Sequence, residues 1–241
     1  MYIACTKYLF ISMSLSALLN QNNSRPTIKV VSDSLVPQQV STPMGLRKSA
    51  DCYQQKFIKF PYIGVFHSYA ELIHAALLEA DQSIISFVPQ PFTLHIGHRR
   101  YVPDCYYVRN GKRIVVELKP RGEFKEELQI PLTAFLKFNG LQFKVISNEE
   151  ILDQEILGMN WLHIIRTLIT AEMEDTTTSE LTLYGQILEG GEQSVGDVIS
   201  IQNRLGHRAT EIALFRLAYR GKVKLSLNKR LISLKTRISC T

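Results

Sequence analysis

The chain has 241 residues, of which 45% are hydrophobic and 21% charged, and its formal net charge is +6. This is the composition of an ordinary globular protein long enough for two domains, which excludes fibrous and fully disordered classes. The excess of positive charge favours a polyanionic partner such as nucleic acid. The four cysteines are widely spaced without a CxxC pair, so they indicate neither a zinc site nor a disulfide framework, and we expect a protein of the reducing cytoplasm.

Residues 1–20 imitate a signal peptide, because Lys7 precedes the apolar run YLFISMSLSALL. However, no small-x-small cleavage site follows, and the run is too short to span a bilayer. An alternative is that translation starts at Met13. The stretch that follows, to about residue 50, is rich in Ser, Asn, Gln and Pro, so we expect residues 1–50 to form a flexible N-terminal arm.

The next element predicted is a helix over residues 68–80, SYAELIHAALLEA, with Ser68 as its N-cap. Glu71 occupies the third helical position, and this allows two interpretations. In the first, Ser68 and Glu71 form a capping box that satisfies the backbone donors of the first turn. In the second, Glu71 supplies a carboxylate to a metal site beside a neighbouring sheet.

A β-hairpin is the strongest local prediction, in the stretch RRYVPDCYYVRNGKRIVVELKP. Residues 99–108 and 112–119 are the predicted strands, and Asn110-Gly111 is a typical two-residue turn between them. Residues 84–88 and 92–96 are predicted as two further strands separated by Pro89-Gln90-Pro91, giving a four-stranded sheet.

The turn fixes the register of this hairpin and places Asp104 directly opposite Glu117. Pleating puts Lys119 on the same face as Glu117. Two opposed carboxylates repel, so a cation is expected between them. Two acids that hold a hard metal ion beside a lysine suit a phosphodiesterase, in the pattern PD…ExK. The alternative is a half-exposed strand whose charges alternate with apolar residues and carry no function.

A helix over residues 124–138 and a buried strand over 142–146 follow, which completes the α/β order of a restriction-endonuclease-like core. Residues 157–173 form a further helix, and EDTTTSE is a predicted linker. Beyond it, the predicted helices and strands make a winged helix-turn-helix: helices over 181–189, 195–205 and 209–219, and strands over 222–227 and 231–236.

Basic residues are concentrated near the carboxyl terminus, where residues 201–241 contain ten Lys or Arg and a single acid, Glu211. Such local asymmetry predicts contact with a phosphate backbone. The candidate DNA-binding residues are Arg99, Arg100, Arg204, Arg208, Arg216, Arg220, Lys222 and Lys224.

The motifs together resemble a known family. Their order is S-x-x-E on a helix, a QPF turn, R-R-Y-x-P-D and then V-E-x-K-P, and LYGQILEGG follows nearer the carboxyl terminus. This order resembles TnsA, the endonuclease subunit of heteromeric transposases and a member of the PD-(D/E)xK superfamily. The likeness runs from about Lys56 to the end, with a departure at His67, where many relatives carry an acid.

The resemblance implies a restriction-endonuclease-like domain over residues 51–173 and a winged-helix domain that binds DNA or a partner over 174–241. It implies that Glu71, Asp104, Glu117 and Lys119 are catalytic, and that the three acids hold Mg²⁺, with Mn²⁺ as a substitute. Glu117 stands where the family also admits Gln. The helix that follows Lys119 lacks an acid that would match the family, so the resemblance leaves open whether the site holds one metal ion or two.

The function implied is cleavage of the 5′ ends of a transposon by a bacterial, nucleoid-associated endodeoxyribonuclease. Its partners would be transposon-end DNA, a TnsB-like DDE transposase, a TnsC-like AAA+ ATPase, and a CRISPR or other target-selection module, with no role for a membrane. Two alternatives stay open. One is a PD-(D/E)xK repair or restriction nuclease that acts alone, and the other is a non-catalytic DNA-binding adaptor that recruits the ATPase.

Overall fold

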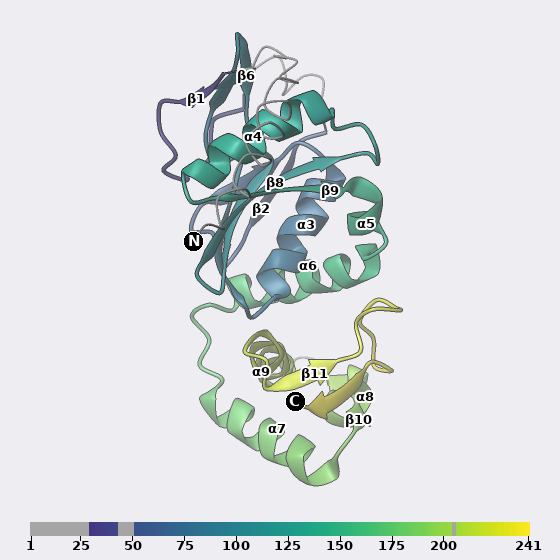
Figure 1. The fold of residues 1–241 in the computed structure, drawn as a ribbon. Coiled ribbons are helices and arrows are strands. Elements are labelled where there is room, and N and C mark those ends of the chain that lie inside the picture. The colour runs from purple at the N-terminus through teal and green to yellow at the C-terminus, as the bar shows by residue number, and fades with distance from the viewer. Residues whose placement is uncertain (1–28, 43–50, 204–205) are drawn as a thin grey trace, which may run out of the picture.

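A computed structural model describes residues 29–42, 51–203 and 206–241 of the chain, and these residues form a mixed α/β fold (Figure 1). The signal-peptide-like run, the alternative start at Met13 and Arg204 lie outside the described residues. Within those ranges, no helix is both long and apolar enough to cross a membrane.

A four-stranded sheet forms the centre of the fold, in the order β4-β7-β8-β9. The strands β4, β7 and β8 are antiparallel, whereas β9 runs parallel to β8. A parallel pair needs a long crossover, and the helix α4 between β8 and β9 supplies it. The bounds are Ile84–Pro89 for β4, Cys105–Arg109 for β7, Lys112–Lys119 for β8, Glu126–Phe138 for α4 and Gln142–Ser147 for β9.

The register of the β7–β8 hairpin is confirmed, because Arg109 pairs with Lys112 and the pairing continues unbroken along both strands. Asn110 and Gly111 have φ of 47° and 75°, as a two-residue turn with two left-handed residues requires. The turn therefore sets the partner of every residue in the hairpin.

The left-handed turn gives a testable contrast between two glycines. Gly111→Ala should destabilise the protein by about 1 kcal/mol, although nothing lies within 4 Å of the added Cβ, because only the positive φ opposes it. Gly185→Ala, in the helix α7 (Thr177–Gly190), also meets nothing but should stabilise by up to about 1 kcal/mol. Urea unfolding of both variants measures the difference, and effects of equal sign would contradict the argument.

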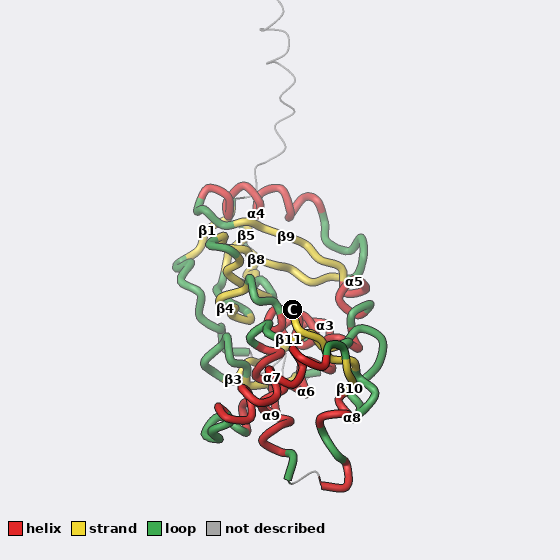
Figure 2. Tube along the Cα trace, turned by 90° about the horizontal axis from the view of Figure 1, so that it is seen from below, coloured by secondary structure: helices red, strands yellow, loops and turns green. Residues whose placement is uncertain are grey.

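Helices cover both faces of the central sheet (Figure 2). Along β8, Val116 belongs to the core that packs against α3 (Tyr69–Ala80) and α6 (Glu155–Thr170), whereas Val115 packs with α4. Successive residues of a strand point to opposite faces, so a continuous apolar run serves both layers. The short helix α5 (Asn148–Leu152) connects β9 to α6.

The predicted strand over residues 99–108 is wrong as a single element, because it divides into β6 (Arg99–Tyr101) and β7. Pro103 lies at the break, where it has no amide hydrogen to give to a ladder. The strand β6 pairs instead with β5 (Leu94–Ile96), so residues 92–96 do not join the central sheet, whose fourth strand is β9.

Part of the expected flexible arm is an ordered segment on this second sheet. The strand β1 (Val30–Ser32) pairs with β5, and beyond it the backbone amides of Gln38 and Val40 donate to the carbonyls of Pro91 and Gln90. The segment therefore supplies backbone hydrogen-bond partners to an edge of β5 that would otherwise be unpaired. A two-stranded sheet of β2 (Tyr53–Lys56) and β3 (Ile63–Phe66) then leads into α3.

The carboxy-terminal part contains two of the three predicted helices and a small sheet in the order β10-β12-β11. The predicted second strand of the wing, over residues 231–236, is wrong, and of the described residues in the predicted helix over 195–205, only those of α8 and of a 3₁₀ turn are helical. The bounds are Gln193–Ser194 for β10, Val195–Val198 for α8, Ile201–Asn203 for the turn, Arg208–Tyr219 for α9, Val223–Leu225 for β11 and Arg237–Cys240 for β12.

The loop before β12 follows another course because Asn160 of α6 binds it. The Asn160 side-chain amide donates to the carbonyls of Leu227 and Arg230, at 2.8 Å each, and its oxygen accepts from the amide of Ile232 at 2.8 Å. The backbone groups that bind Asn160 cannot also form hydrogen bonds with a neighbouring strand. The segment between β11 and β12 is therefore a loop and not the predicted strand.

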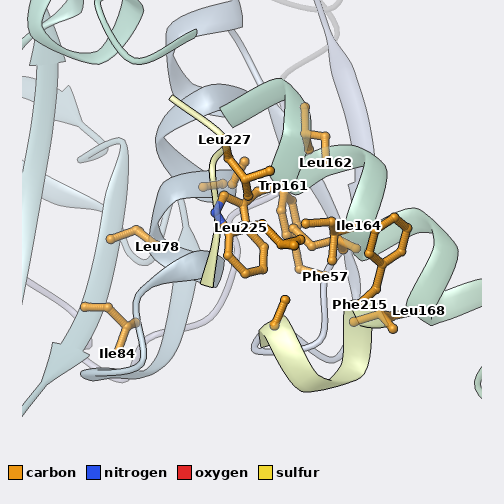
Figure 3. Close-up of a cluster of buried hydrophobic side chains, with 14 of the residues drawn as sticks. Phe57, Leu78, Ile84, Trp161, Leu162, Ile164, Leu168, Phe215, Leu225 and Leu227 are labelled. Carbon is orange, nitrogen blue, oxygen red and sulfur yellow. The ribbon is translucent and has the colours of Figure 1, made fainter. Parts of the chain in front are cut away.

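One hydrophobic core extends across the predicted boundary at residue 173. Phe57, Trp161, Phe215 and Leu225 belong to the same buried cluster (Figure 3). The boundary itself falls in the connection between α6 and α7, and α7 already begins inside the predicted linker. The helix α9 thus packs on the amino-terminal α/β part through apolar contacts rather than being joined to it by a tether alone.

Candidate active site

A cleft of about 750 Å³ lies at the end of β8, where the ordered N-terminal segment, α3, β6 and the start of α4 meet. The cleft collects polar residues from segments far apart in the sequence, among them Ser41, His67, Ser68, Glu71, Gln90, Arg99, Arg100, Tyr101, Asp104, Glu117, Lys119 and Lys125. All four predicted catalytic residues are therefore on its lining.

Asp104 is positioned by the hairpin itself. Its backbone amide donates to the carbonyl of Val116 at 3.1 Å, and its Oδ2 accepts from the backbone amide of Leu118 at 2.6 Å. The amide of Asp104 thus bonds Val116, which the ladder already pairs with Cys105, so the pairing departs by one residue from the hairpin register at the end of β7. The carboxylate lies close enough to Glu117 for the two charges to interact, although the predicted direct pairing of Asp104 with Glu117 is not part of the ladder.

Glu117 is only 2% exposed, and both of its carboxylate oxygens have partners. Lys119 Nζ lies 2.9 Å from Oε1, and the Tyr101 hydroxyl donates to Oε2 at 2.5 Å. The cation expected beside the opposed acids is therefore Lys119. Burial would lower the pKa of Lys119, but Glu117, Asp104 and Glu71 outweigh it and raise the pKa, so the ammonium stays protonated.

Glu71 takes part in the N-cap of α3 without forming the full capping box, because its carboxylate accepts from the amide of His67 and not from that of Ser68. Its role as a metal ligand stays a prediction. Its backbone amide donates to the Ser68 hydroxyl oxygen at 3.2 Å, which is the N-cap of α3. Its carboxylate accepts from the Ser68 hydroxyl and the His67 amide, at 3.1 Å each, and from Gln90 Nε2 at 2.7 Å. Glu71 thus caps the helix and also lines the cleft with Asp104.

The three carboxylates act on one another electrostatically. Burial, then the charges of Glu117 and Glu71, raises the pKa of Asp104 well above its usual value. Burial also raises the pKa of Glu71 and that of Glu117, against the opposing effects of their hydrogen bonds and Lys119. A second cation at this site would relieve the repulsion.

The donor set is suitable for a hard divalent ion, because it consists of carboxylate oxygens. Within the described ranges, no three His, Cys, Asp or Glu side chains form a ready metal-binding group. Mg²⁺ commonly takes one or two carboxylates and fills its shell with water and substrate phosphate oxygens. Asp104 and its acidic neighbours fit this open mode of binding.

The predicted DNA-binding residues fall into two groups. Arg99 and Arg100 are exposed on β6 and line the cleft, and Lys125 lines it from the N-cap position of α4. These cations face the space that a phosphate backbone would occupy if it reached Asp104.

The carboxy-terminal arginines make internal contacts. Arg208 pairs with Glu174 at 2.8 Å, and both Arg216 and Arg220 pair with Glu180 of α7. Arg216 also donates to the carbonyl of Ala171 and to Thr176. Within the described part of the chain, these three side chains hold α9 to the connection before α7 and to α7 itself. Lys222 and Lys224 are exposed on and beside β11.

Two residues that line the cleft, Tyr101 and Gln90, are absent from the predicted site, and so is Gln39, which donates to Gln90. Tyr101 and Gln39 carry no local signal, because only the folded chain brings them to Glu117 and Gln90. The prolines on both sides of Gln90 indicate a turn, and nothing in the sequence shows that its amide would be buried against Glu71. Comparison of the chain with models of known families and with curated proteins found no match.

Proposed function

We propose that the chain is a metal-dependent nuclease that hydrolyses phosphodiester bonds, built on a restriction-endonuclease-like core with a winged-helix part behind it. The observation that carries this is the convergence of Asp104, Glu117 and Lys119 from the hairpin with Glu71 from α3 in one cleft. Arg99 and Arg100 at the same cleft support a polyanionic substrate.

Within that class, we propose the endonuclease subunit of a heteromeric transposase, similar to TnsA. The support is the order S-x-x-E, QPF, R-R-Y-x-P-D and V-E-x-K-P in the sequence. The substrate would be the 5′ ends of a transposon, and the partners would be a DDE transposase, an AAA+ ATPase and a target-selection module. The exposed Lys222 and Lys224 would bind DNA phosphates, or the ATPase, away from the cleft.

The mechanism follows from the charges of the cleft. Asp104 and one of its acidic neighbours, Glu117 or Glu71, would hold Mg²⁺, which would activate water and neutralise charge on the phosphate. Lys119 is protonated, so it donates hydrogen bonds to the nucleophile or the phosphate rather than removing a proton. Burial and then the charge of Glu117 raise the pKa of the Tyr101 hydroxyl, so this hydroxyl keeps its proton and donates a hydrogen bond to Glu117. The bond keeps Glu117 in place. The bond from water oxygen to phosphorus forms as the bond to the leaving oxygen breaks.

The test is cleavage of a labelled duplex that contains the end of the element encoding the chain. With Mg²⁺, the DDE transposase and the ATPase, we expect strand cleavage at the 5′ end, and we expect none with EDTA. Cleavage of unrelated plasmid by the chain alone would overturn the transposition assignment in favour of a repair or restriction nuclease. Binding of ends without cleavage in the complete mixture would favour the adaptor.

A further inference from the structure

Gln90 is an unusual residue in the wall of the cleft. Its side chain is 3% exposed, and its φ of 41° lies in the left-handed region that few residues other than glycine adopt. The backbone amide donates to the carbonyl of Asp104 at 2.9 Å, and the backbone carbonyl accepts from the amide of Val40 at 2.9 Å. A strained conformation persists only where its surroundings enforce it, and such positions cluster at functional sites.

The side chain of Gln90 connects Glu71 to the N-terminal segment. Its Nε2 donates to Glu71 Oε2 at 2.7 Å, and its Oε1 accepts from Gln39 Nε2 at 2.9 Å. Gln39 Nε2 also donates to the carbonyl of Val65 at 2.9 Å. The amide of Gln39 thus uses both of its hydrogens.

The orientation of both amides follows from these partners, without reference to which amide atom is nitrogen. The carbonyl of Val65 can only accept, so the nitrogen of Gln39 must face it. The second hydrogen of that nitrogen then points to Gln90, which must offer its oxygen. The nitrogen of Gln90 is left to face Glu71, where a carboxylate needs a donor.

We infer that Gln39 and Gln90 are positioning residues that hold the Glu71 carboxylate toward Asp104, which makes Gln39 of the N-terminal segment a working part of the site. Gln90 holds Glu71 through its side chain and Asp104 through its backbone, so a single residue sets the spacing of two acids on different elements. This inference rests on the proposed nuclease function for its activity readout.

The first test replaces each amide in the full-length chain. Gln90→Met keeps the length of the side chain but removes the donor, and the rate of single-turnover cleavage should fall about 10- to 100-fold, as it does for outer partners of metal ligands. Affinity for the same DNA, measured with Ca²⁺ in place of Mg²⁺, should stay within about twofold, since Gln90 is buried behind the acids. Binding of Mn²⁺ alone, followed by electron paramagnetic resonance of the free ion, should weaken about tenfold.

The second test replaces the hydrogen-bond donor that faces Glu71 by an acceptor. Gln90→Glu retains an acceptor for Gln39 but sets a carboxylate against Glu71, so it should cleave more slowly than Gln90→Met. A residue that only fills space would give the opposite order, because glutamate is closer to glutamine in shape. Cleavage by Gln90→Glu at or above the rate of Gln90→Met would therefore overturn the inference.

The third test works from the N-terminal segment and remains decisive if the Gln90 variants fail to fold. Gln39→Glu can only accept, so it would turn the Gln90 amide and present its oxygen to Glu71, with a loss of about tenfold in cleavage and in Mn²⁺ affinity. Gln38→Glu is the matched control, because it adds the same charge at an exposed neighbour and should change neither by more than about twofold. Equal behaviour of the two would contradict the inference.

The failure of this inference is distinguishable from failure of the proposed function. An active wild-type chain with Gln39 and Gln90 variants of unchanged rate contradicts the positioning role alone. An inactive wild-type chain contradicts the nuclease proposal, and the Mn²⁺ affinities of the same variants then still decide whether the two amides position Glu71.

Discussion

Asp104→Asn should abolish DNA cleavage and, at the same time, make the metal-free protein more stable. Asparagine can still accept the 2.6 Å bond from the amide of Leu118, so the hairpin keeps its geometry. It removes one of three mutually repelling charges, and with it a principal metal ligand. We expect a loss of at least about 10³-fold in rate, in line with removal of a key electrostatic group from an active site.

The expected gain in stability depends on pH. Because burial and the neighbouring acids raise the pKa of folded Asp104, the folded state binds this proton more tightly than the unfolded state does. The stability of the metal-free wild type therefore falls as pH rises from about 4, the usual pKa of aspartate, through the raised folded pKa. Asp104→Asn should flatten that fall, and thermal melts from pH 4 to pH 8 in EDTA measure it.

Asp81→Asn is the matched control, with the opposite expected sign. Although burial opposes the shift, hydrogen bonds from Ser83 and the charge of Arg109 lower the pKa of Asp81. Its charge therefore stabilises the fold above pH 4, and its removal should lower the melting temperature without changing the rate of cleavage.

Cleavage by Asp104→Asn in Mg²⁺ would refute the assignment of the site, as would normal cleavage by Lys119→Ala.

Asn160→Ala should be the most destabilising of the substitutions outside the cleft. Asn160 is 1% exposed and satisfies two carbonyls and one amide of the loop between β11 and β12. Leaving buried polar groups unpaired costs about 1–3 kcal/mol each, and the effects are not additive, so we expect a loss of about 3 kcal/mol. For a protein of this size, that is a fall of roughly 10 °C in melting temperature.

Asn228→Ala provides the comparison, because Asn228 is an exposed residue of the same type in the same loop. It should change the free energy of unfolding by less than about 0.5 kcal/mol. Differential scanning calorimetry of both variants tests the prediction, and a similar melting temperature for the two would mean that Asn160 does not anchor the loop. Lys222 and Lys224 lie beside and on β11, just before this loop, so release of the loop should also weaken DNA binding.

Features that depend on local geometry could be predicted from the amino-acid sequence alone. Asn110-Gly111 specifies a two-residue turn, which sets the register of the hairpin as far as Cys105 and Val116 and brings Asp104 near Glu117, while the two-residue period puts Lys119 on the same face as Glu117. The cap at Ser68 determined where α3 begins, and so where Glu71 lies on it.

Contacts between segments remote in sequence depended on how the whole chain packs. Whether Glu71 would reach the hairpin depended on how α3 packs against the sheet, and the bond from Gln90 to Glu71 depended on a left-handed residue between two prolines. Tyr101 reached Glu117 because Pro103 interrupted a strand that periodicity alone would continue. The predicted second strand of the wing was wrong because of another contact between remote segments. Asn160, far away along the chain, binds the backbone groups that a local hairpin would use.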